Sequence, residues 1–199
     1  MNFSFEQDLV FENEVALLRP ILEEDWENLL PVATKDTDLL QFSPYPIFTK
    51  NLLQTYLARA VENRLNQIRY TFIVFDKRAK EYAGSTSFLN ISNQDDRLEI
   101  GGTWYGKEFQ RTGLNRNCKY LLLEYAFDFL GAERVEFRID ERNMPSRKAI
   151  EKIGGIYEGT LRRHTLLPDG YRRNTVCYSI LSEEWEELKE HFLDYNGPK

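Results

Sequence analysis

Apolar residues recur along the chain at two spacings, and each spacing predicts a different kind of element. Between Thr49 and Leu65 they recur every three or four residues, the period of a helix with one buried face. A second helical pattern runs from Leu114 to Phe129, and Gly131 after it is a natural helix stop. Shorter helices are expected at residues 23–30, at residues 143–153 and through Trp185, Leu188 and Phe192.

Shorter apolar runs predict strands. Three of them, at residues 70–75, 82–91 and 98–104, are separated only by short polar breaks, which favours an antiparallel meander. The run Val15 to Arg19 ends at Pro20, and because proline cannot donate to a ladder we expect an edge strand there. Further strands are expected at residues 135–139, 157–161 and 175–181. The chain therefore predicts one mixed α/β (α+β) domain over residues 1–199, with antiparallel strands first and a strand-helix-strand-helix section after them.

Composition narrows the class of protein. The 199 residues carry 26 basic and 32 acidic side chains, and a net charge of −6 argues against binding to nucleic acid. Positive charge is concentrated in residues 107–181, which contain 14 basic and 10 acidic residues. No apolar run is long enough to span a membrane and the N-terminus lacks signal-peptide features, so a cytoplasmic location is expected. With two histidines and no C-x-x-C spacing we expect no metal site, and Cys118 and Cys177 are predicted to be reduced core residues.

The most informative local feature is the segment Gln110 to Arg116, between a strand and a long helix. The first N–H groups of a helix have no partner within it and carry partial positive charge, so this junction predicts an anion site. Gly113 would let the backbone close around a phosphate, and a pyrophosphate is a natural occupant. Lys107, Arg111, Arg116 and Lys119 would add positive charge. The segment fits neither a P-loop nor a Rossmann fingerprint, and such a string also arises by chance.

The same segment resembles the acetyl-CoA pyrophosphate loop of the GNAT N-acetyltransferase superfamily, [QR]-x-x-G-x-[GA]. Gln110, Gly113 and Asn115 fall on its fixed positions, with Asn115 departing from the small final residue. Residues 143–155 resemble the N-x-x-S-x-x-x-x-E-K-x-G stretch of the ribosomal-protein N-terminal acetyltransferase (RimJ/RimL-like) subgroup. Segments 17–20, 158–162 and 176–185 are similar to its other signatures. The resemblance covers about residues 17–185.

The resemblance implies the GNAT fold, a single central, mostly antiparallel sheet flanked by helices. It also implies transfer of an acetyl group from the cosubstrate acetyl-CoA to a primary amine by direct attack in a ternary complex, without a metal. The acceptor would be a small molecule or a protein N-terminus, and family members are frequently homodimers. The residues that the resemblance places on acetyl-CoA are Trp104, Gln110, Arg111, Thr112, Gly113, Leu114, Asn115, Arg116 and Asn143.

Two residues are the candidates for proton transfer. Glu99 is the predicted base: if Leu98 and Ile100 face the core, alternation puts Glu99 on the opposite face with Gly101, and the glycine leaves room for a substrate. An ordinary solvated glutamate is the alternative. Many GNAT enzymes use a tyrosine acid where this chain has Ile150, so the predicted acid is the subgroup's serine, Ser146. Ser146 could instead satisfy backbone donors at the helix start.

Other functions remain open at this stage. A non-catalytic acyl-CoA-binding or interaction module on the same fold is one, and a nucleotide-binding protein that uses only the segment before the long helix is another. The acceptor pocket is expected to include residues 31–50. If acidic residues from the first 106 or the last 18 border it, they would favour a cationic amine. The Arg162-Arg163-His164 and Arg172-Arg173 clusters are predicted to be solvated hairpin charges, or to face an acidic substrate or the adenosine 3′-phosphate.

Overall fold

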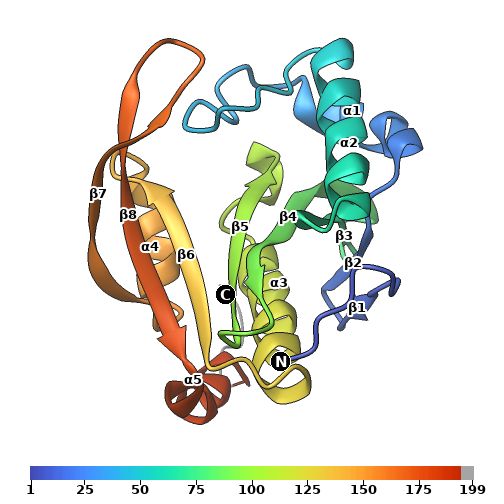
Figure 1. Ribbon diagram of the computed structural model, residues 1–199. Helices are drawn as coiled ribbons and strands as arrows, with labels where there is room; N and C mark the ends of the chain where they lie inside the picture. Colours follow the sequence, from blue (N-terminus) through green and yellow to red (C-terminus); the bar gives the residue numbers. More distant parts are fainter. Residues whose placement is uncertain (194–199) are drawn as a thin grey trace.

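The computed structural model describes residues 1–193, and its centre is one sheet of eight strands in the order β1-β2-β3-β4-β5-β6-β8-β7 (Figure 1). All neighbouring strands are antiparallel except β5 and β6. The strands are β1 Phe11–Glu12, β2 Ala16–Pro20, β3 Arg69–Asp76, β4 Glu81–Ser92, β5 Arg97–Tyr105, β6 Arg134–Asp140, β7 Ile156–Leu166 and β8 Arg172–Leu181.

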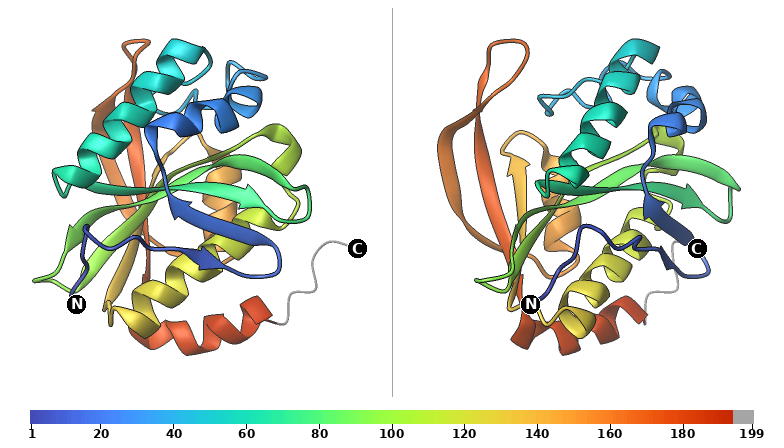
Figure 2. Two further views of the ribbon diagram at one scale, coloured as in Figure 1. Left: turned by 90° about the vertical axis from the view of Figure 1, so that its right-hand side faces the viewer. Right: turned by 45° about the vertical axis from the view of Figure 1, so that its right-hand side comes forward.

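Helices cover both faces of the sheet. Helices α1 and α2 lie on one face, and α3 and α5 lie on the other (Figure 2). The helices are α1 Trp26–Ala33, α2 Lys50–Leu65, α3 Leu114–Glu124, α4 Met144–Glu151 and α5 Ser182–Leu193, with 3-10 turns at Glu23–Asp25 and Lys107–Phe109 and a π-helical turn at Tyr125–Phe129. None of the helices described is long and apolar enough to cross a membrane.

Strand alternation decides which side chains meet the helices. On β6, Val135, Phe137 and Ile139 are buried on one face, whereas Glu136 and Arg138 alternate with them on the other. The apolar face of the sheet packs against α3 through a large aromatic core that includes Phe72 and Phe88. The opposite face of β5, β6 and β8 therefore carries the polar side chains.

The parallel pair β5 and β6 separates after a short contact. Their register covers only Arg97 to Glu99 of β5, opposite Arg134 to Glu136 of β6. Beyond these residues the strands diverge toward the end of the molecule where α3 begins (Figure 1). β4 stays close to β5 there because Gly84 has no side chain. A Cβ at this position would lie 2.0 Å from the Trp104 carbonyl oxygen. The parallel pairing therefore ends at Glu99 of β5 and Glu136 of β6.

Most of the predicted elements are confirmed, but three placements were wrong. The segment Val15 to Arg19 is not an edge strand, since β1 pairs with it. β1 is only two residues long and pairs with Leu17 and Leu18. Pro20 lies beyond this pairing, so its lack of an N–H group costs no hydrogen bond to β1. The last helical turn before Gly131 is π-helical, which rotates Phe129 to 75% exposure. Cys177 is half-buried on the polar face, although Cys118 is in the core.

Candidate functional site

Glu99 lies where β5 and β6 separate, on the polar face of the sheet. Its side chain is 6% exposed, and its Oε2 accepts a hydrogen bond of 2.7 Å from the Asn90 side-chain amide. The Arg138 Nε on β6 lies 3.5 Å from the same oxygen. The other oxygen, Oε1, lies 2.9 Å from where a Cβ of Gly101 would be. The absent side chain of Gly101 thus makes room for the Glu99 carboxylate itself, and the burial of Glu99 does not fit the alternative of an ordinary solvated glutamate.

The surroundings of Glu99 act on its protonation in two directions. Burial raises the pKa of the carboxyl group above its ordinary value, and this is the largest effect. The hydrogen bond from Asn90 and the charges of Arg138 and Arg69 lower the pKa, while Glu136 raises it. The result is a carboxyl group with a pKa moved toward neutrality and a hydrogen bond that fixes its orientation, which suits a group that exchanges protons.

Two further arginines approach Glu99 from other strands. Arg69 of β3 donates from Nε to the Ser87 hydroxyl at 2.9 Å, and its Nη2 lies 2.1 Å from the place where a Cβ of Gly102 would be. Gly102 has φ +56°, so both its backbone and the guanidinium above it require glycine. Arg173 of β8 donates from Nη1 to the Phe42 carbonyl at 3.0 Å and acts electrostatically on Glu99.

The segment before α3 is folded mainly by its own hydrogen bonds. The Gln110 side chain donates to the Tyr105 carbonyl at 3.0 Å, and the Thr112 hydroxyl donates to the Phe109 carbonyl at 2.8 Å. Arg111 and Gly113 have positive φ, of 62° and 90°, which turns the chain sharply into the helix. Nothing lies within 4 Å of a Cβ built on Gly113, so open space adjoins the first turn of α3. These predicted residues form one compact turn at the helix start.

Four side chains that were expected to add positive charge at this turn have different roles. Lys107 forms an ion pair of 2.8 Å with Asp36. Arg116 donates to the His191 carbonyl at 2.7 Å and stacks over the Phe192 ring, so it holds α5 against α3. The expected contribution of Lys119 is wrong, because its amine is buried between α3 and the sheet and donates to Thr103 at 2.8 Å. Arg111 is exposed and forms no ion pair with any described residue.

Three polar groups near the turn have no partner within the described chain. The Trp104 indole N–H and the Asn115 side-chain oxygen are buried and form no hydrogen bond. The backbone N–H of Asn115, at the second position of α3, also has no partner in residues 1–193. Buried polar groups are rarely left unpaired, so these groups indicate a site for a ligand.

The start of α4 places Asn143 and Ser146 together. The Asn143 side-chain oxygen accepts from the Ser146 backbone N–H at 3.2 Å, which makes Asn143 the N-cap of the helix. The Ser146 hydroxyl forms no hydrogen bond with any described residue, so it does not cap the helix as the alternative interpretation required. The Ser146 hydroxyl is thus available to another molecule.

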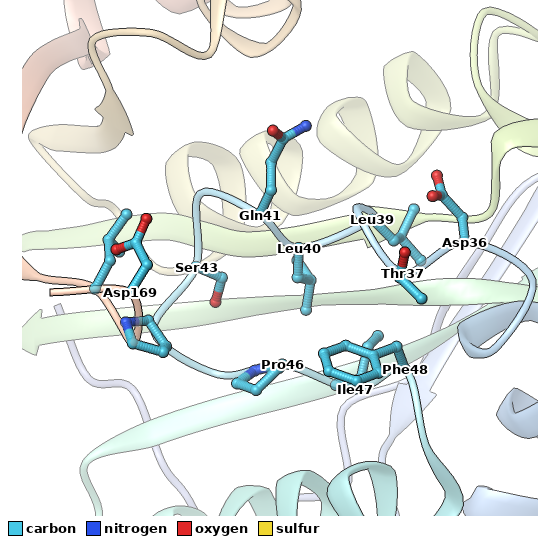
Figure 3. A pocket seen from close by; sticks show the side chains of 12 residues that line it. Asp36, Thr37, Leu39, Leu40, Gln41, Ser43, Pro46, Ile47, Phe48 and Asp169 are labelled. Carbon is cyan, nitrogen blue, oxygen red and sulfur yellow. The ribbon is translucent and has the colours of Figure 1, made fainter. Parts of the chain in front are cut away.

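A pocket of about 160 Å³ lies where the connection between α1 and α2 meets the β7–β8 hairpin. Leu40 on one limb of this connection points toward the other limb, where Pro46, Ile47 and Phe48 lie (Figure 3). Asp169 of the hairpin lies at one end of the pocket (Figure 3). The ring of Phe42, on the same connection, packs beneath the guanidinium of Arg142. A hydrogen bond from Arg173 of β8 to the Phe42 carbonyl joins the connection to the hairpin.

Sequence reasoning missed the residues that surround Glu99. Asn90, Arg69, Arg138 and Arg173 come from β4, β3, β6 and β8, and no local motif links them. Their common signal is weak: each is a polar residue in or beside a run of strand-forming residues, on the face opposite the apolar ones. Acidic side chains border the pocket beside the connection between α1 and α2, where Asp36 and Asp169 lie, whereas the charges that act on Glu99 are those of two arginines and Glu136.

Comparison with known proteins gives a consistent result. The family described as "Acetyltransferase (GNAT) domain" matches residues 16–156. The chain is 35% identical over 106 residues to the "Putative ribosomal N-acetyltransferase YdaF" of Bacillus subtilis, an alignment that covers 53% of this chain and 57% of that protein. It is 25% identical to "Uncharacterized N-acetyltransferase p20" of Bacillus licheniformis, over 83% of this chain and 88% of that protein.

Solved structures show the same fold. The crystal structure of a GCN5-related N-acetyltransferase from Brucella melitensis superposes with a TM-score of 0.88 at 26% identity, covering 96% of this chain and 87% of that one. The name of the YdaF relative, a ribosomal N-acetyltransferase, supports the resemblance to the RimJ/RimL-like subgroup. The family match over residues 16–156 and the shared fold agree with each other. The chain therefore belongs to the GNAT family of acetyl-CoA-dependent N-acetyltransferases.

Proposed function

We propose that this protein transfers the acetyl group of acetyl-CoA to a primary amine, on a protein N-terminus or a small molecule, by direct attack within a ternary complex. The observation that carries the proposal is the buried, hydrogen-bonded carboxylate of Glu99 at the point where β5 and β6 separate. A non-catalytic acyl-CoA-binding module would have no use for a carboxyl group with a raised pKa at this position.

The turn before α3 suits the anionic part of acetyl-CoA. Gly113 leaves open space, and the N–H of Asn115 and the partial charge of the helix N-terminus would bind phosphate oxygens. The unpaired Trp104 indole N–H is a further donor on β5. Asn143 has a side-chain nitrogen without a partner in the described chain, which would bind the pantetheine arm. We assign Gln110, Arg111, Thr112, Leu114 and Arg116 to holding or framing this turn.

Glu99 would receive the proton that the acceptor amine must lose. An amine reaches the thioester as a nucleophile only in its neutral form, and a carboxylate with a raised pKa removes the proton directly or through a water molecule. Acetyl-CoA supplies an activated acetyl group as its thioester. Asn90 would keep Glu99 in one orientation while the proton moves.

Ser146 would donate a proton to the departing thiolate, since its hydroxyl is not used elsewhere in the described chain. Direct attack is favoured over an acetylated cysteine. Burial raises the pKa of the Cys118 thiol to about 12 and also raises the pKa of Cys177, so neither thiol is an activated nucleophile.

The acceptor would enter beside the connection between α1 and α2, within the expected residues 31–50, where the 160 Å³ pocket meets the β7–β8 hairpin. The name of the YdaF relative refers to a ribosomal substrate. We therefore include ribosomal-protein N-termini among the candidate acceptors, beside small amines.

A screen of amines with purified protein and acetyl-CoA, read out as release of free CoA thiol, tests the proposal. Peptides with free N-termini and small primary amines form the two arms, and N-acetylated versions of each are the controls. We expect release only with free amines. Saturable binding of acetyl-CoA with no release above the amine-free rate in either arm would instead support the binding-module alternative.

A further inference from the structure

Three arginines act electrostatically on the Glu99 carboxylate, and within the described chain two of them have no ion-pair partner. Arg138 lies 3.5 Å from Glu99 and 3.2 Å from Glu136, so its charge is shared between two carboxylates. Within the described chain, Arg69 and Arg173 form no ion pair with any acidic side chain. Asp140, the acidic residue that acts on Arg173, is bound by Arg142 at 2.7 Å. Two cations thus remain unbalanced beside the predicted base.

Each of these two arginines also has a buried nitrogen without a hydrogen-bond partner, Nη2 of Arg69 and Nε of Arg173. A guanidinium has donors in a fixed fork that matches carboxylate and phosphate groups, and leaving such donors buried and unpaired is costly. Desolvation lowers the pKa of Arg173, as expected for a cation without a counter-ion. The unpaired donors indicate that an anionic partner is missing from each side of Glu99.

Hydrogen bonds to the fold hold each of the two arginines in place. Arg69 is fixed by the Ser87 hydroxyl and lies over Gly102, while Arg173 is fixed by the Phe42 carbonyl of the connection between α1 and α2. Both belong to the polar face that carries Glu99, and acetyl-CoA phosphates are assigned to the turn at the start of α3 instead. The two arginines are therefore positioned for the second substrate.

Resting on the proposed function, we propose that the amine acceptor carries a negatively charged group, a carboxylate or a phosphate, close to its amine, and that Arg69 and Arg173 bind this group. The amine then lies beside Glu99 while its anion engages the unpaired guanidinium donors. Two sources offer this chemistry, a small amino-acid-like metabolite and a peptide N-terminus followed by an acidic residue.

Matched amine pairs that differ only in charge test the proposal. The small-molecule arm compares β-alanine with β-alaninamide and O-phosphoethanolamine with ethanolamine, and the peptide arm compares Ser-Glu with Ser-Gln N-termini. We expect kcat/KM at least tenfold higher for the anionic member in one arm, mainly through KM. The arm that shows it identifies the source. Equal or better turnover of the neutral members in both arms overturns the proposal.

Variants assign the preference to the arginines. Arg69→Gln and Arg173→Gln should each reduce the anionic preference to less than threefold, while Arg172→Gln, an exposed neighbour on the other face of β8, should keep it. Arg69→Lys and Arg173→Lys keep the charge, so they should retain part of the preference even if a glutamine variant does not fold. A preference that survives in the folded variants of both Arg69 and Arg173 contradicts the assignment.

A binding readout separates this inference from the proposed function. The shift in Tm caused by each amine in the presence of CoA needs no turnover. If no amine is acetylated but the anionic members stabilise the wild type and not Arg69→Gln, the binding of an anion by the arginines stands while the proposed acetyl transfer fails. If neither member of any pair changes the Tm and none is acetylated, both fail.

Discussion

Two regions of this GNAT protein, the start of α3 and the surroundings of Glu99, present positive charge in different ways. At the start of α3 it comes from backbone N–H groups of one short segment, while Lys107 and Arg116 are engaged in ion-pair and helix contacts. Around Glu99 it comes from guanidinium groups on separate strands, fixed by hydrogen bonds such as that of Arg69 to Ser87. The first arrangement is a local motif suited to one common cofactor, and the second is a tertiary arrangement able to vary with the acceptor.

Substitution of the predicted base, Glu99, should have the largest effect on activity and should leave the region at the start of α3 unaffected. Glu99→Gln keeps the shape of the side chain and removes its ability to accept a proton, so kcat should fall about 10²- to 10⁴-fold with the KM for acetyl-CoA unchanged. Steady-state kinetics checks this. Glu136→Gln is the matched control, since Glu136 also contacts Arg138 and should retain most activity. Wild-type turnover in Glu99→Gln would remove Glu99 from the mechanism.

A smaller loss of turnover is expected at α4. Ser146→Ala removes the proposed acid without removing the helix cap, which is Asn143, so kcat should fall about 10- to 100-fold, at the low end of acid catalysis because a thiolate leaves readily. A thiol-trapping assay measures it. Ser146→Thr keeps a hydroxyl and should remain active, whereas equal rates for the alanine variant and the wild type would exclude the acid role.

Substitution at the turn of α3 should affect the cofactor end alone. Gly113→Val places a branched side chain in the open space beside the helix start, so the KM for acetyl-CoA should rise about tenfold and CoA should stabilise the protein less in a melting assay. Gly131→Val is the control, because Gly131 has a similar φ, +66°, and open space at the other end of this helical segment. Both changes cost about 1–2 kcal/mol of stability. Unchanged stabilisation by CoA in Gly113→Val would contradict the assignment.

The smallest effect concerns the pH profile. Arg138 lowers the pKa of Glu99, so Arg138→Gln should raise that pKa. The base is active only when deprotonated, and the acid limb of the kcat/KM profile should therefore move to higher pH, with the plateau rate changed only a few fold. A shift to lower pH, or none, would show that Arg138 does not act on the base. Arg172→Gln should leave the limb in place.

The sequence predicted most of the elements and the position of the turn before α3, because both depend on local patterns. Helical spacing located α2, and Gln110, Gly113 and Asn115 marked the turn before α3. The edge assignment for Val15 to Arg19 failed since a strand of only two residues, β1, leaves no recognisable pattern. Phe129 was misplaced because a π-helical turn changes the spacing within the last turn of the helix.

The acceptor side could not be predicted in the same way. Arg69 and Arg138 are 69 positions apart in the chain and lie near one carboxylate only because β3, β5 and β6 share a sheet. Counting charges by segment placed Arg138 and Arg173 in the positive segment 107–181, but it could not show that these two side chains and Arg69 act on Glu99. Strand pairing across a sheet joins residues that are distant in the chain, and the local sequence carries little information about it.

The buried Lys119 has a consequence for the energetics of folding. Desolvation lowers its pKa from 10.5 to about 8, so folding at pH 9 expels a proton that the unfolded chain retains. Between pH 8 and 10.5 the unfolded state binds more protons at this site, and stability should rise with pH by an amount on the order of 3 kcal/mol from this group alone. Below pH 8 the fold holds a charged amine beneath α3, where Thr103 is its hydrogen-bond partner. The contribution of Lys119 alone therefore favours the folded state more at pH 10.5 than at pH 8.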